Sequence, residues 1–175
     1  MTSSYIKIGI PSQDIVKMYG NGDQRRRKYF YQQSLTESTL LKGGDNKYRC
    51  SFRSAEAYLT AAEASAELGD LKSAREYLLT LGAKRYTTAR LATYTGELEA
   101  MDKATLLQAI YDERERELSF EGHRWFDLRR TTQPALSKTY SGKTYTLQQG
   151  DDRYTLRFPT EAVEANPNIE IWNKQ

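Results

Sequence analysis

The chain has 175 residues, of which 38% are hydrophobic and 28% are charged, and its formal net charge is +3. This length fits one domain or a large piece of one, and it is long enough to bury a core. The small positive excess is spread along the chain apart from the cluster 25–28, so nucleic-acid binding has no global electrostatic support. One histidine and one cysteine cannot form the usual zinc sites, and Cys50 has no partner for an intrachain disulfide.

The N-terminal segment from Met1 to Val16 lacks the basic start and the long apolar run of a signal peptide. No later segment is apolar enough to span a membrane. Two interpretations remain open: a cytoplasmic protein, or an exported protein whose signal lies upstream of this sequence.

The first third of the chain predicts irregular structure with short strands. Ser12 is placed to cap a short helix over Gln13–Tyr19. The segment 20–23, Gly-Asn-Gly-Asp, is a strong turn signal. Beyond it, Arg25–Gln33 and Lys47–Phe52 are predicted to pair as two strands of a hairpin.

Residues 53–68 and Leu71–Leu81 have apolar side chains at helical spacing. Gly69 ends the first helix and Asp70 caps the second, so the link between them is very short. Two helices joined in this way pack antiparallel. The pattern is typical of a tetratricopeptide-type helical hairpin.

A second pair of helices is predicted further along. Residues 82–101 form a looser connection, after which Asp102 caps a long helix that runs to about Phe120. Gly122 interrupts it, and a shorter helix continues through Arg130. The sequence therefore predicts a mostly α fold.

After Thr131 the pattern changes to loop and strand. Lys143–Leu147 and Arg153–Phe158 are predicted to form a hairpin around Gln148–Asp152, where Gly150 supplies the turn. No low-complexity segment or long linker interrupts the sequence, so residues 1–175 are expected to form a single domain.

The segment 113–130 reads ERERELSFEGHRWFDLRR and closely resembles the SusD/RagB family signature ER-x-x-EL-x-FEG-x-RW-x-DL-x-R. Three other stretches resemble the family in its own order. They are Ile10-Pro11-Ser12 through Tyr19 with Asp23 and Arg25, then Arg53 through Ala64, and finally Phe158-Pro159-x-Glu161 with Asn166-Pro167 and Asn173. Departures occur at Leu79-Thr80 and Lys84-Arg85, which match the family's pattern only approximately.

The resemblance implies a SusD-like fold of helical hairpins with irregular segments and short β-hairpins. Such proteins are non-enzymatic, take no cofactor, and capture oligosaccharide or another nutrient for a SusC-like TonB-dependent porin. They are lipid-anchored at the outer-membrane surface and longer than this chain, with a lipoprotein signal and helical repeats before the matching region. The chain is therefore expected to be a C-terminal portion, mainly scaffold, whose membrane association depends on an upstream anchor.

The signature is rich in carboxylates, which raises the possibility of a glycosidase. Glu113 and Glu117 are spaced i and i+4, so they lie on one helix face about 5–6 Å apart at Cβ. Two neighbours on one helix cannot straddle a glycosidic bond, and nearby arginines would keep both ionised. We therefore expect a structural ion-pair network that includes Glu113, Arg114, Glu117, Glu121, Arg124, Asp127 and Arg129 and has no metal.

Tyrosine is unusually common, with 13 residues against 5 Phe and 2 Trp. Its ring suits both half-buried packing and stacking on sugars. The aromatic residues in the loop and hairpin segments are the candidates for glycan contact, and packing against the scaffold is the alternative for each. These candidates are Tyr140, Tyr145, Tyr154 and Trp172.

Three other functions are alternatives to nutrient binding. A helical-repeat module that binds a partner protein fits the helical hairpins. A hydrolase would require Glu117 to take part in turnover, whereas the structural hypothesis requires it for stability. The basic run 25–28 followed by Tyr29-Phe30-Tyr31 superficially resembles a nucleic-acid patch, but a strand with charges on both sides explains it more simply.

Overall fold

The structure is a computed structural model that describes residues 10–32, 38–42, 53–156, 158–166 and 168–169. The chain divides into two compact units, Met1–Arg124 and Trp125–Gln175. The described residues are mostly helical, with two small antiparallel strand pairs, which confirms the predicted fold class. The predicted Lys47–Phe52 strand and Trp172 lie outside the described residues.

The core of the first unit is built on the predicted helical hairpin, α3 (Ser54–Glu67) and α4 (Leu71–Gly82). Gly69 has a φ of +87°, and the Asp70 carboxylate accepts a hydrogen bond from the Ser73 amide at 3.0 Å. These two features end one helix and start the next. Alanines at the centre of the hairpin are fully buried, which lets the two backbones approach closely; they are Ala62, Ala66 and Ala74.

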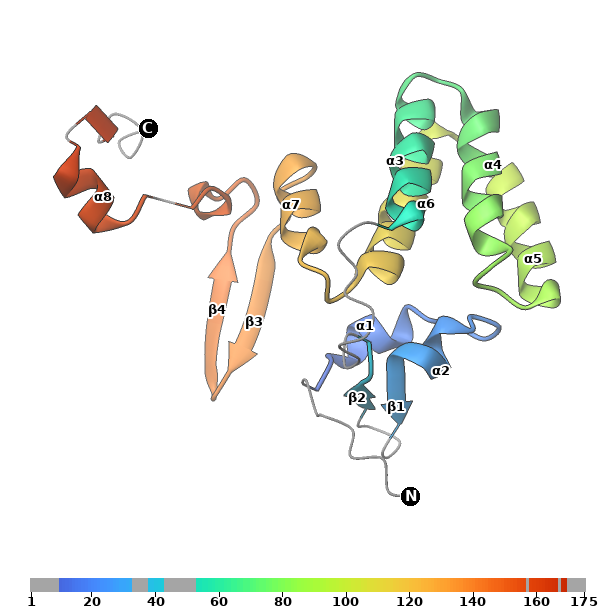
Figure 1. Ribbon diagram of the computed structural model, residues 1–175, viewed down its shortest axis with the longest axis horizontal. Helices are drawn as coiled ribbons and strands as arrows, with labels where there is room; N and C mark the ends of the chain where they lie inside the picture. Colours follow the sequence, from blue (N-terminus) through green and yellow to red (C-terminus); the bar gives the residue numbers. More distant parts are fainter. Residues whose placement is uncertain (1–9, 33–37, 43–52, 157, 167, 170–175) are drawn as a thin grey trace. The chain divides into compact units, whose positions relative to one another are not determined.

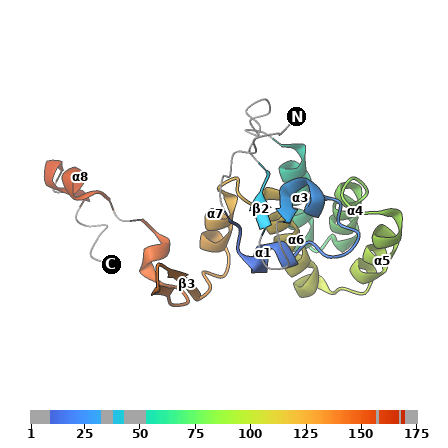
Figure 2. The same ribbon diagram turned by 90° about the horizontal axis from the view of Figure 1, so that it is seen from below.

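Two further helices, α5 (Thr88–Glu99) and α6 (Lys103–Leu118), lie beside this hairpin (Figures 1 and 2). The long α6 was predicted, but the prediction of a loose connection over residues 82–101 was wrong. Thr87 caps α5 at its start, and the Arg75 side chain donates to the carbonyl oxygens of Leu98 and Met101 at its end. Only Tyr94 and Leu98 of this helix are buried, and its other residues are mostly polar or small.

The N-terminal segment contributes α1 (Gln13–Lys17), α2 (Arg25–Tyr29), β1 (Phe30–Gln32) and β2 (Ser38–Leu40). Ser12 caps α1 as predicted, with its hydroxyl 3.5 Å from the Ile15 amide. The strand predicted over Arg25–Gln33 is wrong in its first half, where Arg25–Tyr29 form α2, and Gln33 lies outside the described residues. The short strand that follows pairs with β2, with Tyr31 opposite Thr39.

The turn before α2 is hydrogen-bonded to the link between α4 and α5. The Thr87 amide donates to the Gly22 carbonyl oxygen at 2.9 Å, and the Gln24 amide donates to that of Arg85 at 2.9 Å. The Gln24 side chain also donates to the Tyr86 carbonyl oxygen at 3.2 Å. These bonds join segments about sixty residues apart and hold the turn in one conformation.

We expect Gly22→Ala to lower the free energy of unfolding by about 1–3 kcal/mol. Gly22 has a φ of +83°, and an added Cβ would lie 2.6 Å from Cβ of Arg90. Gly20→Ala is the matched control, because a Cβ there meets nothing within 4 Å. Urea denaturation followed by circular dichroism measures both variants, and equal stability of the two would contradict the expectation.

The second unit contains most of α7 (His123–Arg130), then β3 (Leu136–Tyr140), β4 (Lys143–Leu147), a 3-10 turn (Asp152–Tyr154) and α8 (Thr160–Ala165). The prediction that Lys143–Leu147 forms a hairpin with Arg153–Phe158 names the wrong second strand. The strand β4 pairs instead with β3, because Ser141 and Gly142 both adopt positive φ and form a two-residue turn.

Candidate functional site

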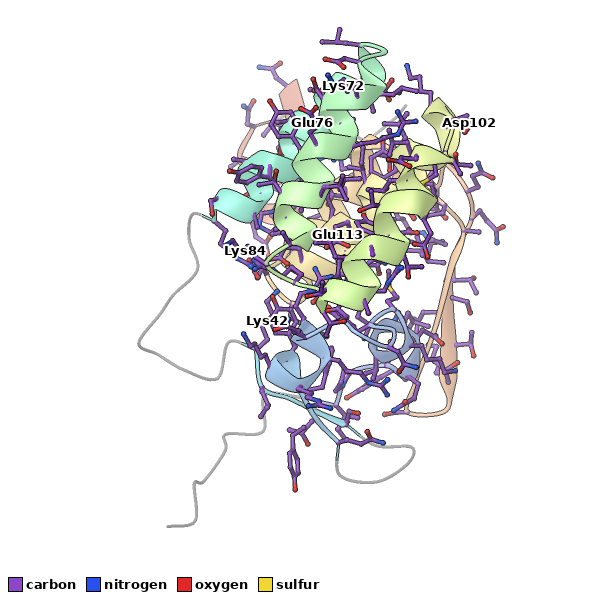
Figure 3. The ribbon with its side chains drawn as sticks, turned by 90° about the vertical axis from the view of Figure 1, so that its right-hand side faces the viewer. Lys42, Lys72, Glu76, Lys84, Asp102 and Glu113 are labelled. Carbon is purple, nitrogen blue, oxygen red and sulfur yellow. The ribbon has the colours of Figure 1, made fainter. Side chains whose placement is uncertain are left out.

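A group of charged side chains is enclosed in the first unit, centred on two glutamates of α6. Glu113 and Glu117 are 1% and 0% exposed, and each is bound by more than one cation, of which only Arg116 lies on the same helix. Arg25 donates to Glu113 at 2.6 Å and to Glu117 at 2.9 Å through one guanidinium nitrogen. In Figure 3 the labelled Glu113 lies among the helices. One arginine of the N-terminal segment therefore joins both glutamates of the helix.

Arg25 is itself held by Asp23 two residues earlier. Its guanidinium makes bonds of 3.0 and 2.7 Å to the two carboxylate oxygens of Asp23, and it is only 2% exposed. Tyr86 completes its surroundings, since its hydroxyl donates to Glu113 at 2.8 Å and accepts from Arg25 at 3.3 Å. Each polar group at the centre thus has a hydrogen-bonding partner, which burial of charge requires.

Three further arginines bind the carboxylate oxygens of the two glutamates. Arg116 binds Glu113 at 2.7 and 2.9 Å, and Arg85 binds both oxygens of Glu117 at 2.7 and 2.8 Å. Arg53 forms a further ion pair with Glu117. The result is a network in which four arginines surround two glutamates and an aspartate.

The C-terminal end of α6 is satisfied by the same set of side chains. Lys42 donates to the carbonyl oxygens of Glu117 and Ser119 at 2.7 and 2.9 Å, and Arg53 donates to that of Glu117 at 2.8 Å. The Tyr19 hydroxyl donates to the Arg116 carbonyl oxygen at 2.6 Å. Cations at a helix C-terminus stabilise its dipole and its unpaired carbonyl groups.

The electrostatics of the network keep both glutamates ionised. Burial alone would raise the pKa of Glu113, but the charges of Arg25 and Arg116 outweigh it and lower the pKa below its ordinary value. Burial likewise opposes ionisation of Glu117, and hydrogen bonds and charge from Arg85, with charge from Arg25 and Arg53, lower its pKa. A general acid must hold its proton near neutral pH, so this pair is suited to ion pairing and not to acid catalysis.

The second unit presents a different feature, the exposed hairpin β3–β4. Its strand register places Tyr140 opposite Lys143 and Lys138 opposite Tyr145, so these four side chains share one face. Tyr140 is 75% exposed and Tyr145 is 53% exposed, and the Lys143 amine lies 5.3 Å from the centre of the Tyr145 ring. The opposite face carries only small hydroxyl side chains, namely Ser137, Thr139, Thr144 and Thr146.

Tyr154 is placed differently from the two hairpin tyrosines. It is 1% exposed, and its ring stacks on Trp125 with the ring centres 5.0 Å apart. Its hydroxyl donates to the carbonyl oxygen of Pro134 at 2.5 Å. These contacts engage the ring and its polar tip within the second unit, which favours the packing alternative for Tyr154.

Comparison with known proteins gives a family for this arrangement. A sequence model of the SusD family matches residues 13–170 of the chain. The chain belongs to the SusD family. Over 94 residues it is 38% identical to a SusD-like protein P25 of Formosa agariphila, a match that covers 54% of this chain and 17% of that relative.

The fold of this SusD-family chain resembles a solved structure of a SusD-like carbohydrate-binding protein from Bacteroides vulgatus. The TM-score is 0.54 at 21% sequence identity, and the match covers 88% of this chain and 40% of the other. The chain thus spans less than half the length of the relatives it matches. None of the helices in the described ranges is long and apolar enough to cross a membrane.

The segment 113–130 that carries the SusD-family signature contributes both glutamates of the network and one of its central cations, Arg116, whereas Asp23 and the other arginines come from earlier in the chain. Glu121 pairs with Lys42 and Arg53, Arg124 pairs with Glu115 at 2.6 Å, and Arg114 bonds to Thr60 at 3.3 Å. In the second unit, Asp127 pairs with Arg130 at 2.8 Å. Arg129 is exposed on α7, where its carbonyl oxygen accepts a hydrogen bond from Gln133.

Sequence reasoning missed the cations that enclose Glu117. Arg25, Arg53 and Arg85 come from segments 92, 64 and 32 residues before it. Arg25 and Arg53 lie in stretches that resemble the family, and Arg85 lies where the chain matches the family's pattern only approximately. The sequence therefore contained a signal for them, but no local spacing rule connects them to the signature.

Proposed function

We propose that the chain is a non-catalytic glycan-binding part of a SusC/SusD-type uptake system, with its first unit acting as scaffold. The match of the SusD family to residues 13–170 carries this proposal. The similarity in fold to a carbohydrate-binding protein supports it. The buried network supports the absence of catalysis, because Glu113 and Glu117 are enclosed by arginines that hold them ionised.

Sugar contact is assigned to the exposed face of the β3–β4 hairpin. Tyr140 and Tyr145 are diagonal neighbours on this face, at a spacing that side chains as large as tyrosine can bridge. An aromatic ring offers its face to the C–H surface of a sugar, and its hydroxyl can bond to a sugar hydroxyl. The adjacent lysines Lys138 and Lys143 add hydrogen-bond donors to the same face.

Affinity electrophoresis through gels that contain a panel of neutral glycans tests this assignment. We expect the chain to be retarded by at least one glycan, and Tyr140→Ala/Tyr145→Ala to weaken that retardation about tenfold, because two stacking contacts are lost. Thr139→Ala/Thr144→Ala is the control, since it changes the opposite face of the same hairpin. Equal retardation of the tyrosine variant and the parent chain would remove the hairpin from the binding surface.

The transport partner follows from the same proposal. A SusC-like TonB-dependent porin is the expected partner, and the outer-membrane surface is the expected location, with attachment through a lipid anchor upstream of this sequence. Co-purification with such a porin in the absence of retardation by any glycan would favour the interaction-module alternative instead.

A further inference from the structure

Two adjoining cavities lie beside the buried network, among the described residues of the first unit. One has a volume of about 530 Å³ and lies over the turn before α2 and the strands that follow it. The other, of about 460 Å³, lies between the same turn and Thr87. They share Gly22, Asp23 and Arg27, so together they form one cleft around α2.

The cleft is positively charged because three of the four basic residues of α2 line it, while the fourth is buried in the network. Arg25 is buried and committed to the network, whereas the next three side chains, Arg26, Arg27 and Lys28, are exposed and line the cleft. None of these three makes an ion pair or a hydrogen bond through its side chain with another residue of the described ranges. Asp23 also lines the cleft, but both oxygens of its carboxylate are bonded to Arg25.

The neutral lining of the larger cavity is of the kind that recognises sugars. Tyr31 is 56% exposed and presents an aromatic ring, while Asn21 and Gln32 present amide groups. Val16 and Phe30 supply apolar surface. Apolar surface with a few polar groups is usual in small-ligand sites, and aromatic and amide side chains suit the two kinds of surface of a sugar ring.

We propose that this cleft binds an acidic oligosaccharide, with Arg26 and Arg27 pairing with its carboxylate or sulfate groups and Tyr31 contacting a ring. Arginine is suited to this role because its planar guanidinium binds such groups through two hydrogen bonds. The turn is also held in place by its bonds to Thr87 and Arg85, so the cleft is formed before the ligand arrives. The inference rests on the proposed function, and it adds a binding surface separate from the β3–β4 hairpin, in the unit otherwise assigned as scaffold, together with the substrate class of that surface.

Isothermal titration of the 175-residue chain with matched pairs of oligosaccharides tests the inference. The first pair is tetragalacturonate and its full methyl ester, and the second is a sulfated carrageenan tetrasaccharide and its desulfated form. In at least one pair we expect the acidic member to bind ten times more tightly or better, with affinity that falls as salt rises. The pair that shows the difference identifies the acidic group.

The variant Arg26→Gln/Arg27→Gln is expected to lose that preference, with a tenfold or greater loss for the acidic member only. The control is Lys72→Gln/Lys103→Gln, which removes the same charge from exposed positions. In Figure 3 the labelled Lys72, and Asp102 beside Lys103, lie at the end of the helices away from α2. The control should bind like the parent chain.

Four results would overturn the inference. In the first, the chain is retarded by neutral glycan gels but binds the acidic and neutral members of each pair equally. This result would leave the proposed function in place and remove only the preference for acidic sugars. Acidic binding that Arg26→Gln/Arg27→Gln leaves unchanged would place the site elsewhere. An octathymidylate that binds more tightly than either acidic sugar would make the cleft a nucleic-acid site. Failure of all oligosaccharides and all gels would reject both proposals.

Discussion

Arg25→Ala is expected to lower the free energy of unfolding by about 3–5 kcal/mol, the usual cost of removing one partner from a buried ion pair. The guanidinium of Arg25 contacts three carboxylates, those of Asp23, Glu113 and Glu117, and all three are buried. Without it, these negative charges would remain in an interior that cannot solvate them. Urea denaturation at neutral pH measures the loss.

The neighbouring residue provides a matched control. Arg26→Ala removes the same side chain from the next position of α2, where it is exposed, and should change stability by less than about 0.5 kcal/mol. Arg25→Lys keeps the charge but not the planar fork, so we expect it to recover only part of the loss. Similar stability of Arg25→Ala and Arg26→Ala would show that the network contributes little.

Acidification is expected to produce the second large loss of stability. Glu113 and Glu117 have lowered pKa values in the folded chain, whereas in the unfolded chain glutamate titrates near about 4.3. The unfolded state therefore binds more protons as the pH falls through this range. The contribution of the network is complete above about pH 5 and is lost progressively below it, by up to about 2.7 kcal/mol per pH unit for two groups.

Urea denaturation across a series of pH values measures this dependence. Glu117→Gln should be less stable at neutral pH and should lose stability less steeply with acid, because one of the two titrating groups is gone. Glu76→Gln is the control, since Glu76 is exposed on α4 (Figure 3) and its partner Lys72 lies 3.9 Å away. A Glu117→Gln variant with the full acid slope would show that other groups cause the loss.

The helices with a broad apolar stripe were predictable from the sequence, and the others were not. In α3 and α4, most buried residues recur every three or four positions, and Gly69 and Asp70 mark the turn between the two helices. In α5 only Tyr94 and Leu98 are buried, and the helix is otherwise polar and contains a glycine. Its stability comes from packing and from the Arg75 cap, which lies elsewhere in the sequence.

Turn chemistry explains the error in the second unit. Two turn signals compete there, Ser141-Gly142 and the segment 148–152, and the predicted hairpin used the second. The two-residue turn with positive φ matches the right-handed twist of paired strands, so the first turn forms the hairpin. This choice placed Tyr140 and Tyr145 on one face, which the predicted pairing would not have done.

The candidate site was predictable in composition but not in connectivity. The acidic signature, the expectation of arginine partners and the structural interpretation of Glu113 and Glu117 all followed from residue types. The identity of the partners did not, because charged side chains have many alternatives and no periodicity selects among them. Only the fold brings Arg25, Arg53 and Arg85 to the same end of α6.

The span of the buried network also affects how the first unit folds. Arg25 lies 88 and 92 residues from the glutamates that it joins, whereas the α3–α4 hairpin is closed by a short turn. Contacts between distant segments carry a larger entropic cost of loop closure than local contacts do. The local helices therefore form before Arg25 reaches the two glutamates. Interactions absent from the transition state slow unfolding without speeding folding. The late arrival of Arg25 would therefore lengthen the lifetime of the native unit more than it would hasten its formation.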